Sequence, residues 1–125
     1  MSVTLFQMHE LSRNLWSMLL SWESHMGQKQ LKAAIEIQPI SVGVEADTSF
    51  QLYDSGILND DLCGADLDHA VTAVGYGIEN GVEYYLVRNS WGSSWGENGY
   101  IRILAGFDGL GICGILEDSL YPETN

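Results

Sequence analysis

One stretch of this chain decides how the rest is interpreted: Asn89-Ser90-Trp91-Gly92-Ser93-Ser94-Trp95-Gly96-Glu97-Asn98-Gly99-Tyr100. Its glycines carry no Cβ, so the backbone around the two indoles can turn sharply and approach other segments closely. Such a stretch suits neither an ordinary helix nor an edge strand. It comes shortly after the apolar run 84–87, so we expect a strand to deliver Asn89 to a fixed point.

A histidine lies upstream of this stretch, in the segment Asp68-His69-Ala70-Val71. An asparagine oxygen that accepts a hydrogen bond from an imidazole N–H fixes the orientation and the tautomer of the ring. A catalytic base needs that support. A lone histidine is more often a hydrogen-bonded core residue, so the residues alone make His69, oriented by Asn89, a candidate catalytic base.

The pattern resembles the C-terminal half of a papain-family cysteine peptidase, from about Gln38 to the C-terminus. The resemblance rests on blocks that occur in order: Cys63-Gly64, Asp68-His69-Ala70-Val71, Val74-Gly75-Tyr76-Gly77, Asn89-Ser90-Trp91-Gly92, Trp95-Gly96-Glu97-Asn98-Gly99-Tyr100, Cys113-Gly114-Ile115 and Tyr121-Pro122. A single such block would be weak support, whereas the ordered set is specific.

The expected fold is α+β, with helices before an antiparallel, barrel-like sheet. We divide the chain into a helical leader, 1–37, which resembles nothing in the family up to about residue 27, and a papain-like domain, 38–125. Within this plan we expect a helix over 28–37 that ends before Pro39, a polar loop over 47–56, a tight hairpin at Asn80-Gly81, and strands over 40–46, 69–77, 83–88, 99–104 and 112–116.

The resemblance also implies roles around the catalytic pair. Trp91 would shield the His69–Asn89 hydrogen bond from water, and Trp95 would form the wall on the leaving-group side. Asp68 would accept backbone hydrogen bonds and tune the histidine.

A substrate pocket follows from the same resemblance. Gly43 and Ala70 would line the pocket for the side chain that precedes the scissile residue, and Asp118 would lie at its floor. An acidic floor would accept a basic side chain as well as apolar ones.

The chain has two cysteines, Cys63 and Cys113, which the resemblance pairs in a disulfide. Such a bond would close a loop of roughly fifty residues and stabilise the fold by about 3–4 kcal/mol. Cys63 as a nucleophile is the less favoured alternative, because a nucleophilic thiol needs a base facing it. The family's nucleophilic cysteine signature does not occur in the chain, and none of its glutamines stands six residues before a cysteine, as the family's oxyanion-hole glutamine does.

Net charge excludes some classes of partner. A charge of −12 disfavours nucleic acids and anionic membranes. The acidic residues of 59–68 lack the spacing of a calcium loop, and we expect no metal and no cofactor. The resemblance implies a lysosomal or extracellular location, although residues 1–30 make a poor signal peptide.

Three interpretations of the function follow. The first is a cysteine peptidase half that carries His69 and Asn89, acts on peptide or protein substrates, and needs another chain to supply the nucleophile, so that it is inactive alone. The second is a non-catalytic module that binds peptides or a peptidase. The third is a truncated product without a stable fold.

Overall fold

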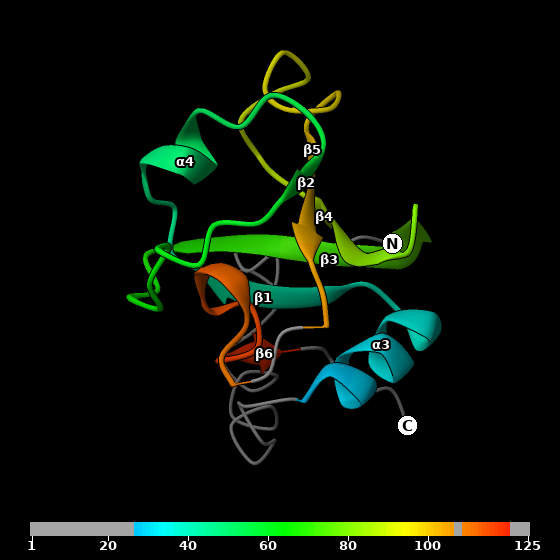
Figure 1. The fold of residues 1–125 in the computed structure, drawn as a ribbon. Helices are drawn as coiled ribbons and strands as arrows, with labels where there is room; N and C mark the ends of the chain where they lie inside the picture. Colours follow the sequence, from blue (N-terminus) through cyan, green and yellow to red (C-terminus); the bar gives the residue numbers. More distant parts are fainter. Residues whose placement is uncertain (1–26, 107–108, 121–125) are drawn as a thin grey trace, which may run out of the picture.

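The computed structural model describes residues 27–106 and 109–120 (Figure 1). Most of the predicted helical leader lies outside this range, as do His9 and His25. The described part contains, in chain order, α3 (Gln28–Ile37), β1 (Ile40–Val44), α4 (Thr48–Gln51), β2 (Ile57–Leu58), β3 (His69–Glu79), β4 (Val82–Arg88), β5 (Tyr100–Leu104), the 3-10 helix η1 (Ile112–Gly114) and β6 (Ser119–Leu120). The α+β class is thereby confirmed.

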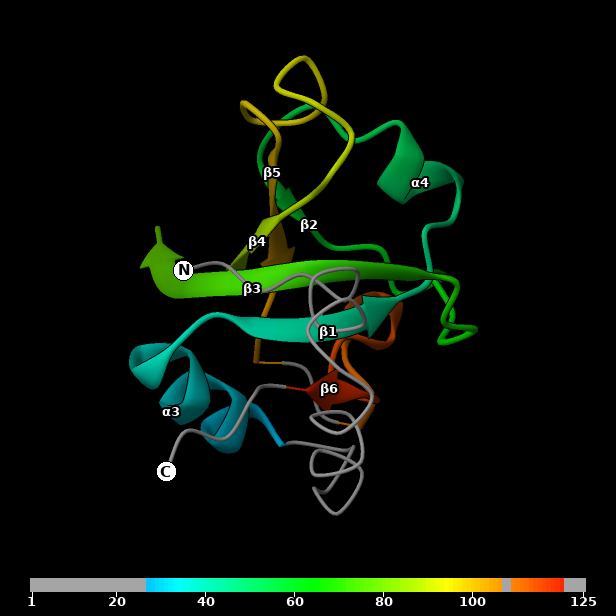
Figure 2. The same ribbon diagram turned by 180° about the vertical axis from the view of Figure 1, so that it is seen from behind.

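The strands of the described residues form one six-stranded sheet, in the order β2-β5-β4-β3-β1-β6. Its pairings are antiparallel except for the short β2–β5 pair, which is parallel. The sheet coils strongly, and Figures 1 and 2 show β5 running across the direction of β1 and β3. A register shift between Ala73 and Gly75 marks a bulge in the β3–β4 pair, and bulges increase local twist.

The β3–β4 hairpin turns where the sequence predicts. Asn80 and Gly81 both have left-handed backbone conformations, with φ of 52° and 83°. Positive φ at both central residues is the signature of the type I′ turn, whose twist matches that of the flanking strands. The hairpin thus connects the strand that begins at His69 to the strand that ends just before Asn89.

Helix α3 has the predicted bounds. Gln30 Oε1 accepts a hydrogen bond from the backbone N–H of Gly27 at its start, and the helix ends two residues before Pro39, which restricts the residue before it. Leu31, Ala34 and Ile35 pack into a core formed with the sheet and with η1. No helix among residues 27–106 and 109–120 is long and apolar enough to cross a membrane.

Two local predictions were wrong, and one strand is shorter than predicted. The loop predicted over 47–56 contains α4, which Asp47 caps by accepting a hydrogen bond from the N–H of Phe50. The strand predicted over 112–116 is the helical turn η1, flanked by glycines with positive φ. The first strand ends at Val44 rather than at residue 46, and it pairs with β3 on one side and β6 on the other.

Candidate active site

The sheet brings His69 and Asn89 together from two neighbouring strands. His69 is the first residue of β3, and Asn89 follows the last residue of the antiparallel strand β4. His69 Nε2 lies 2.7 Å from Asn89 Oδ1, and Asn89 is 7% exposed. The loop after β4 holds the asparagine in place, because the N–H of Asn89 donates to the carbonyl of Gly99.

The surrounding hydrogen bonds determine the tautomer of His69. The backbone N–H of Ser90 also donates to Asn89 Oδ1, at 2.8 Å, so this atom is the acceptor oxygen of the amide. His69 Nε2 therefore carries the hydrogen that Asn89 accepts. The lone pair of the neutral imidazole then resides on Nδ1, where it can take up a proton.

Aromatic rings enclose the histidine. Trp91 stacks on the imidazole, with ring centroids 4.8 Å apart and planes 22° apart, and Phe50 of α4 contacts the imidazole edge-on at 6.0 Å. Trp95 packs on both Phe50 and Trp91, and its Nε1–H donates to the carbonyl of Gln51. We call Phe50, Trp91 and Trp95 the aromatic cluster. It limits the access of water to one face of the imidazole.

Asp68 makes the kind of contact that its position predicts. Its Oδ1 accepts a hydrogen bond from the N–H of Ala46 at 2.8 Å, and its N–H donates to the carbonyl of Val44. These bonds tie the residue before His69 to the end of β1. One backbone and one side-chain hydrogen bond therefore hold the start of β3 in place.

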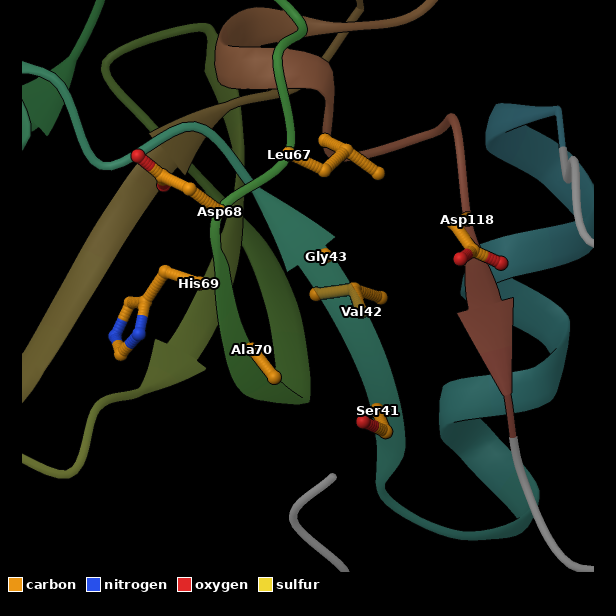
Figure 3. A pocket seen from close by; sticks show the side chains of 8 residues that line it. All are labelled: Ser41, Val42, Gly43, Leu67, Asp68, His69, Ala70 and Asp118. Carbon is orange, nitrogen blue, oxygen red and sulfur yellow. The ribbon is translucent and has the colours of Figure 1, made fainter. Parts of the chain in front are cut away.

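The three predicted pocket residues line one cavity. Its volume is about 370 Å³, and its walls consist of Ser41, Val42, Gly43, Leu67, Asp68, His69, Ala70 and Asp118. Leu67 and Asp118 extend into the space around Gly43, whereas the imidazole of His69 points away from it (Figure 3). A Cβ on Gly43 would lie 3.0 Å from Leu67 Cδ1, so glycine keeps this part of the cavity open.

Asp118 is partly withdrawn from water in this cavity. Burial raises the pKa of its carboxyl group above the ordinary value of 3.8, since the charged form loses solvation. The backbone carbonyl of Asp118 accepts a hydrogen bond from the N–H of Gly43, which holds the carboxylate beside β1.

The predicted disulfide between Cys63 and Cys113 is present, with a Cα–Cα distance of 4.8 Å. Asp47 lies near it, and these three residues are the one set within the described ranges that offers three clustered potential metal ligands. Both sulfurs are bonded to each other and a carboxylate oxygen of Asp47 accepts from Phe50 and Ser49, so this cluster is structural.

Sequence reasoning missed several residues that shape the site. Phe50 contacts the histidine and Leu67 lines the pocket, and the sequence assigned neither of them a role. Glu97 and Arg102 form a two-armed ion pair behind the aromatic cluster. The aspartate before Thr48 was an available signal for α4, because aspartate is a preferred helix N-cap.

Comparisons with known proteins agree with this geometry. A model of the papain family of cysteine proteases matches residues 10–123, which extends the resemblance further toward the N-terminus than the sequence blocks did. Cysteine proteinase RD21A of Arabidopsis thaliana is 53% identical over 100 residues, covering 78% of this chain and 21% of that protein. Cysteine endopeptidase Rep1 of Oryza sativa subsp. japonica is 52% identical over 96 residues, covering 74% of this chain and 25% of that protein.

Solved structures give the same result. The bromelain protease from Ananas comosus, in complex with the E64 inhibitor, superimposes with a TM-score of 0.77 at 48% identity, covering 81% of this chain and 47% of that one. The ragweed pollen cysteine protease Amb a 11, in its proform, gives a TM-score of 0.75 at 36% identity, covering 78% of this chain and 30% of that one. The chain thus spans less than a third of the length of the two curated relatives described above. From the matched residues and the shared fold, this chain belongs to the papain family of cysteine proteases.

Proposed function

We propose that this chain forms the half of a cysteine-type peptidase site that carries the base and its orienting amide. A segment outside these residues would supply the thiolate. The observation that carries the proposal is the 2.7 Å contact between His69 Nε2 and Asn89 Oδ1, which leaves Nδ1 as the proton acceptor. Peptides or proteins would be the substrates.

In the proposed reaction, Nδ1 of His69 removes the proton from the incoming thiol, and the thiolate attacks the peptide carbonyl carbon. The imidazolium then gives that proton to the leaving amine nitrogen, which releases the first product and leaves a thioester. His69 next takes a proton from water, whose oxygen attacks the thioester carbonyl carbon. The C–S bond then breaks, the carboxylic acid product leaves, and the imidazolium returns the proton to the sulfur, which restores the thiol. Asn89 keeps the ring in one orientation through both steps.

Two features of the site support the proposal that a nucleophile-bearing segment covers it. Trp91 is 40% exposed although it stacks on the histidine. The Nδ2 amide of Asn89 is buried and has no hydrogen-bond partner among the described residues. An unsatisfied buried donor costs about 1–3 kcal/mol, so a segment whose docking opens this enclosed position and brings a carbonyl oxygen to Nδ2 would stabilise the site.

The disulfide supports two parts of the proposal: that the nucleophile comes from another segment, and that the protein follows a secretory route. Cys63 and Cys113 are bonded to each other, so neither offers a thiolate while the bond is intact. Disulfides persist in oxidising compartments. We therefore propose a secretory route that ends in a lysosome-like compartment or outside the cell.

The cavity at Asp118 supports a preference for the neighbouring substrate side chain. Its apolar walls favour an aliphatic or aromatic group, while the carboxylate at its edge would pair with a lysine or arginine. In an active peptidase completed by a nucleophile-bearing segment, Asp118→Asn should reduce the cleavage of substrates with a basic side chain at this position and should not affect substrates with an apolar one. Equal loss for both substrates would contradict this role.

A chimera tests the catalytic proposal. The matched segment of cysteine proteinase RD21A is exchanged for the corresponding residues of this chain, and hydrolysis of a fluorogenic peptide is measured. We expect a folded, active chimera whose kcat/KM falls at least ~10³-fold with His69→Ala. A folded chimera without activity, or one that His69→Ala leaves active, would overturn the proposal.

A second candidate function is a non-catalytic module that binds peptides. The pairing of both cysteines and the formed pocket favour it for the chain by itself. Isothermal titration of the full chain with a peptide that carries a basic side chain separates the two. Binding by the chain together with an inactive chimera would support the module.

A further inference from the structure

A carboxylate behind the aromatic cluster joins three separate segments. Glu97 Oε1 accepts from Arg102 Nε at 2.9 Å, and Glu97 Oε2 accepts from Arg102 Nη2 at 3.0 Å. The same Oε2 accepts from the backbone N–H of Gly56 at 2.9 Å. Glu97 thereby ties the loop of Asn89 to β5 and to the segment that follows α4.

The cation of this pair is itself firmly held. Arg102 lies on β5 with a side chain that is 16% exposed, and its Nη1 contacts Glu79 at 3.1 Å. Its guanidinium also lies over the ring of Tyr84, 5.2 Å from the centroid. A guanidinium fixed by two carboxylates and an aromatic face is a rigid anchor, because its planar fork matches a carboxylate with two parallel hydrogen bonds.

The same two segments meet again at the aromatic cluster. Trp95 lies two residues before Glu97, and its Nε1–H donates to the carbonyl of Gln51 at the end of α4. Phe50 of α4 then contacts both His69 and Trp91. Movement of the segment 51–56 relative to the loop would therefore change how the indole of Trp91 lies on the imidazole.

We propose that Glu97 is a positioning residue for His69, acting through the loop that carries Trp91. Its ion pair with Arg102 and its bond to Gly56 hold the two segments at the spacing that stacks Trp91 on the imidazole. The effect on turnover rests on the proposed peptidase function, whereas the effect on the ring stack does not.

The charge state of Glu97 fits this role. The hydrogen bonds from Arg102, more than any other contact, lower the pKa of the Glu97 carboxyl group, and the N–H of Gly56 adds to the effect. The carboxylate is therefore ionised at neutral pH. A glutamine of the same shape would keep one acceptor oxygen and would place an amide N–H group against donors.

Proton NMR of the full 125-residue chain tests the stack. The face of an indole shields nearby protons, so the His69 ring protons should resonate upfield of those of free histidine. His69→Ala assigns these signals, and Trp91→Ala defines the complete loss of shielding. We expect Glu97→Gln to remove a large part of the shielding that Trp91→Ala removes.

Glu79→Gln is the matched control. It makes the same chemical change against the same guanidinium, but Glu79 has no bond to Gly56 or to the loop. We expect it to leave the His69 signals in place. An Arg102→Lys variant, which keeps the charge and loses the fork, should resemble Glu97→Gln. Circular dichroism verifies that each variant is folded.

Kinetics of the RD21A chimera provide the second measurement. Glu97→Gln should lower kcat by ~10–10²-fold at unchanged KM, since a misplaced base slows the chemical step without weakening substrate binding. Unchanged His69 signals in folded Glu97→Gln, or equal shifts in Glu79→Gln, would overturn the positioning role. An inactive parent chimera with a normal stack would overturn the proposed function alone.

Discussion

Two glycine-rich segments of this protein lack regular strands, yet the sequence predicted an irregular backbone for only one of them. The segment 89–100 carries Asn89 and the two tryptophans, and the segment 109–118 carries Cys113 and Asp118. Both rely on the left-handed backbone conformation: the first at Gly92, Gly96, Asn98 and Gly99, the second at Gly109, Gly111, Cys113 and Gly114.

The difference lies in what holds each segment. Within 89–100, the N–H of Gly99 donates to Trp95, and Glu97 and Tyr100 exchange backbone hydrogen bonds. The segment 109–118 is also closed by local backbone hydrogen bonds, such as those from the N–H of Gly114 to Gly111 and from the N–H of Leu116 to Leu110. It is in addition attached covalently to a distant residue, because Cys113 is bonded to Cys63. The disulfide is therefore the link that only the second segment has.

The largest test of this contrast removes the disulfide. Replacing Cys63 and Cys113 with alanine should lower the free energy of unfolding of the chain by about 4 kcal/mol, because a closed loop of about fifty residues is released in the unfolded state. Urea unfolding measures this change. Amide hydrogen exchange should accelerate more in 109–118 than in 89–100.

The opposite pattern of exchange would contradict the contrast. If the amides of 89–100 lost as much protection as those of 109–118, the loop of Asn89 would depend on the disulfide rather than on its own bonds. The single Cys63→Ala variant serves as a control, because it breaks the same bond and leaves Cys113 as a free thiol. It should give a similar loss of stability.

A pair of glycine substitutions probes how closely each segment is packed. A Cβ on Gly96 would lie 2.6 Å from the carbonyl oxygen of Tyr100, and one on Gly114 would lie 2.9 Å from Leu67 Cδ2. The Cβ on Gly114 would also lie 3.0 Å from Ala65 Cα, so both substitutions crowd backbone atoms, but the approach is closer at Gly96. We therefore expect Gly96→Ala to cost about 3 kcal/mol and Gly114→Ala about 2 kcal/mol. Thermal unfolding measures both.

Gly81→Ala separates backbone strain from crowding. Gly81 also has a positive φ, of 83°, but a Cβ there would meet no atom within 4 Å. The Gly81→Ala substitution should therefore lower the free energy of unfolding by only about 1–2 kcal/mol, which is the cost of the left-handed conformation for a residue with a Cβ. Equal losses at Gly81 and Gly96 would mean that close packing within the loop of Asn89 adds nothing.

The sequence predicted two pairings better than it predicted the segments around them. The contact of His69 with Asn89 and the Cys63–Cys113 bond were expected from residue types that occur in a specific order, and the strands β1 and β3 begin at Ile40 and His69 as expected. The run 112–116 was interpreted as a strand because it is apolar, although burial in a core is equally compatible with a helical turn. The role of the Glu97–Arg102 ion pair could not be predicted from the sequence. Its environment includes the N–H of Gly56 and the carboxylate of Glu79, which only the folded chain brings close to the pair.

The smallest effect concerns pH, and it has opposite signs in the two segments. The pKa of Glu97 is lowered from 4.5, chiefly by hydrogen bonds from Arg102, so its stabilisation is present above pH 4.5 and is lost as the pH falls through the lowered pKa. The pKa of Asp118 is raised from 3.8 by burial, so the folded state binds its proton more tightly than the unfolded state does. The contribution of Asp118 to stability therefore decreases as the pH rises from 3.8 through the raised pKa.

Urea unfolding of two matched amide variants between acidic and neutral pH measures these effects. Glu97→Gln should destabilise the chain most at neutral pH, and its effect should shrink as the pH falls below 4.5. Asp118→Asn should become more favourable, relative to the unmodified chain, as the pH rises above 3.8, because the amide avoids the cost of burying a charge. If both differences changed in the same direction with pH, one of the two carboxylates would not have the environment that the structure assigns to it. Opposite pH dependences of the two stability differences would establish that an ion pair stabilises the loop of Asn89, whereas the disulfide-linked segment is more stable when the carboxyl group of Asp118 is protonated.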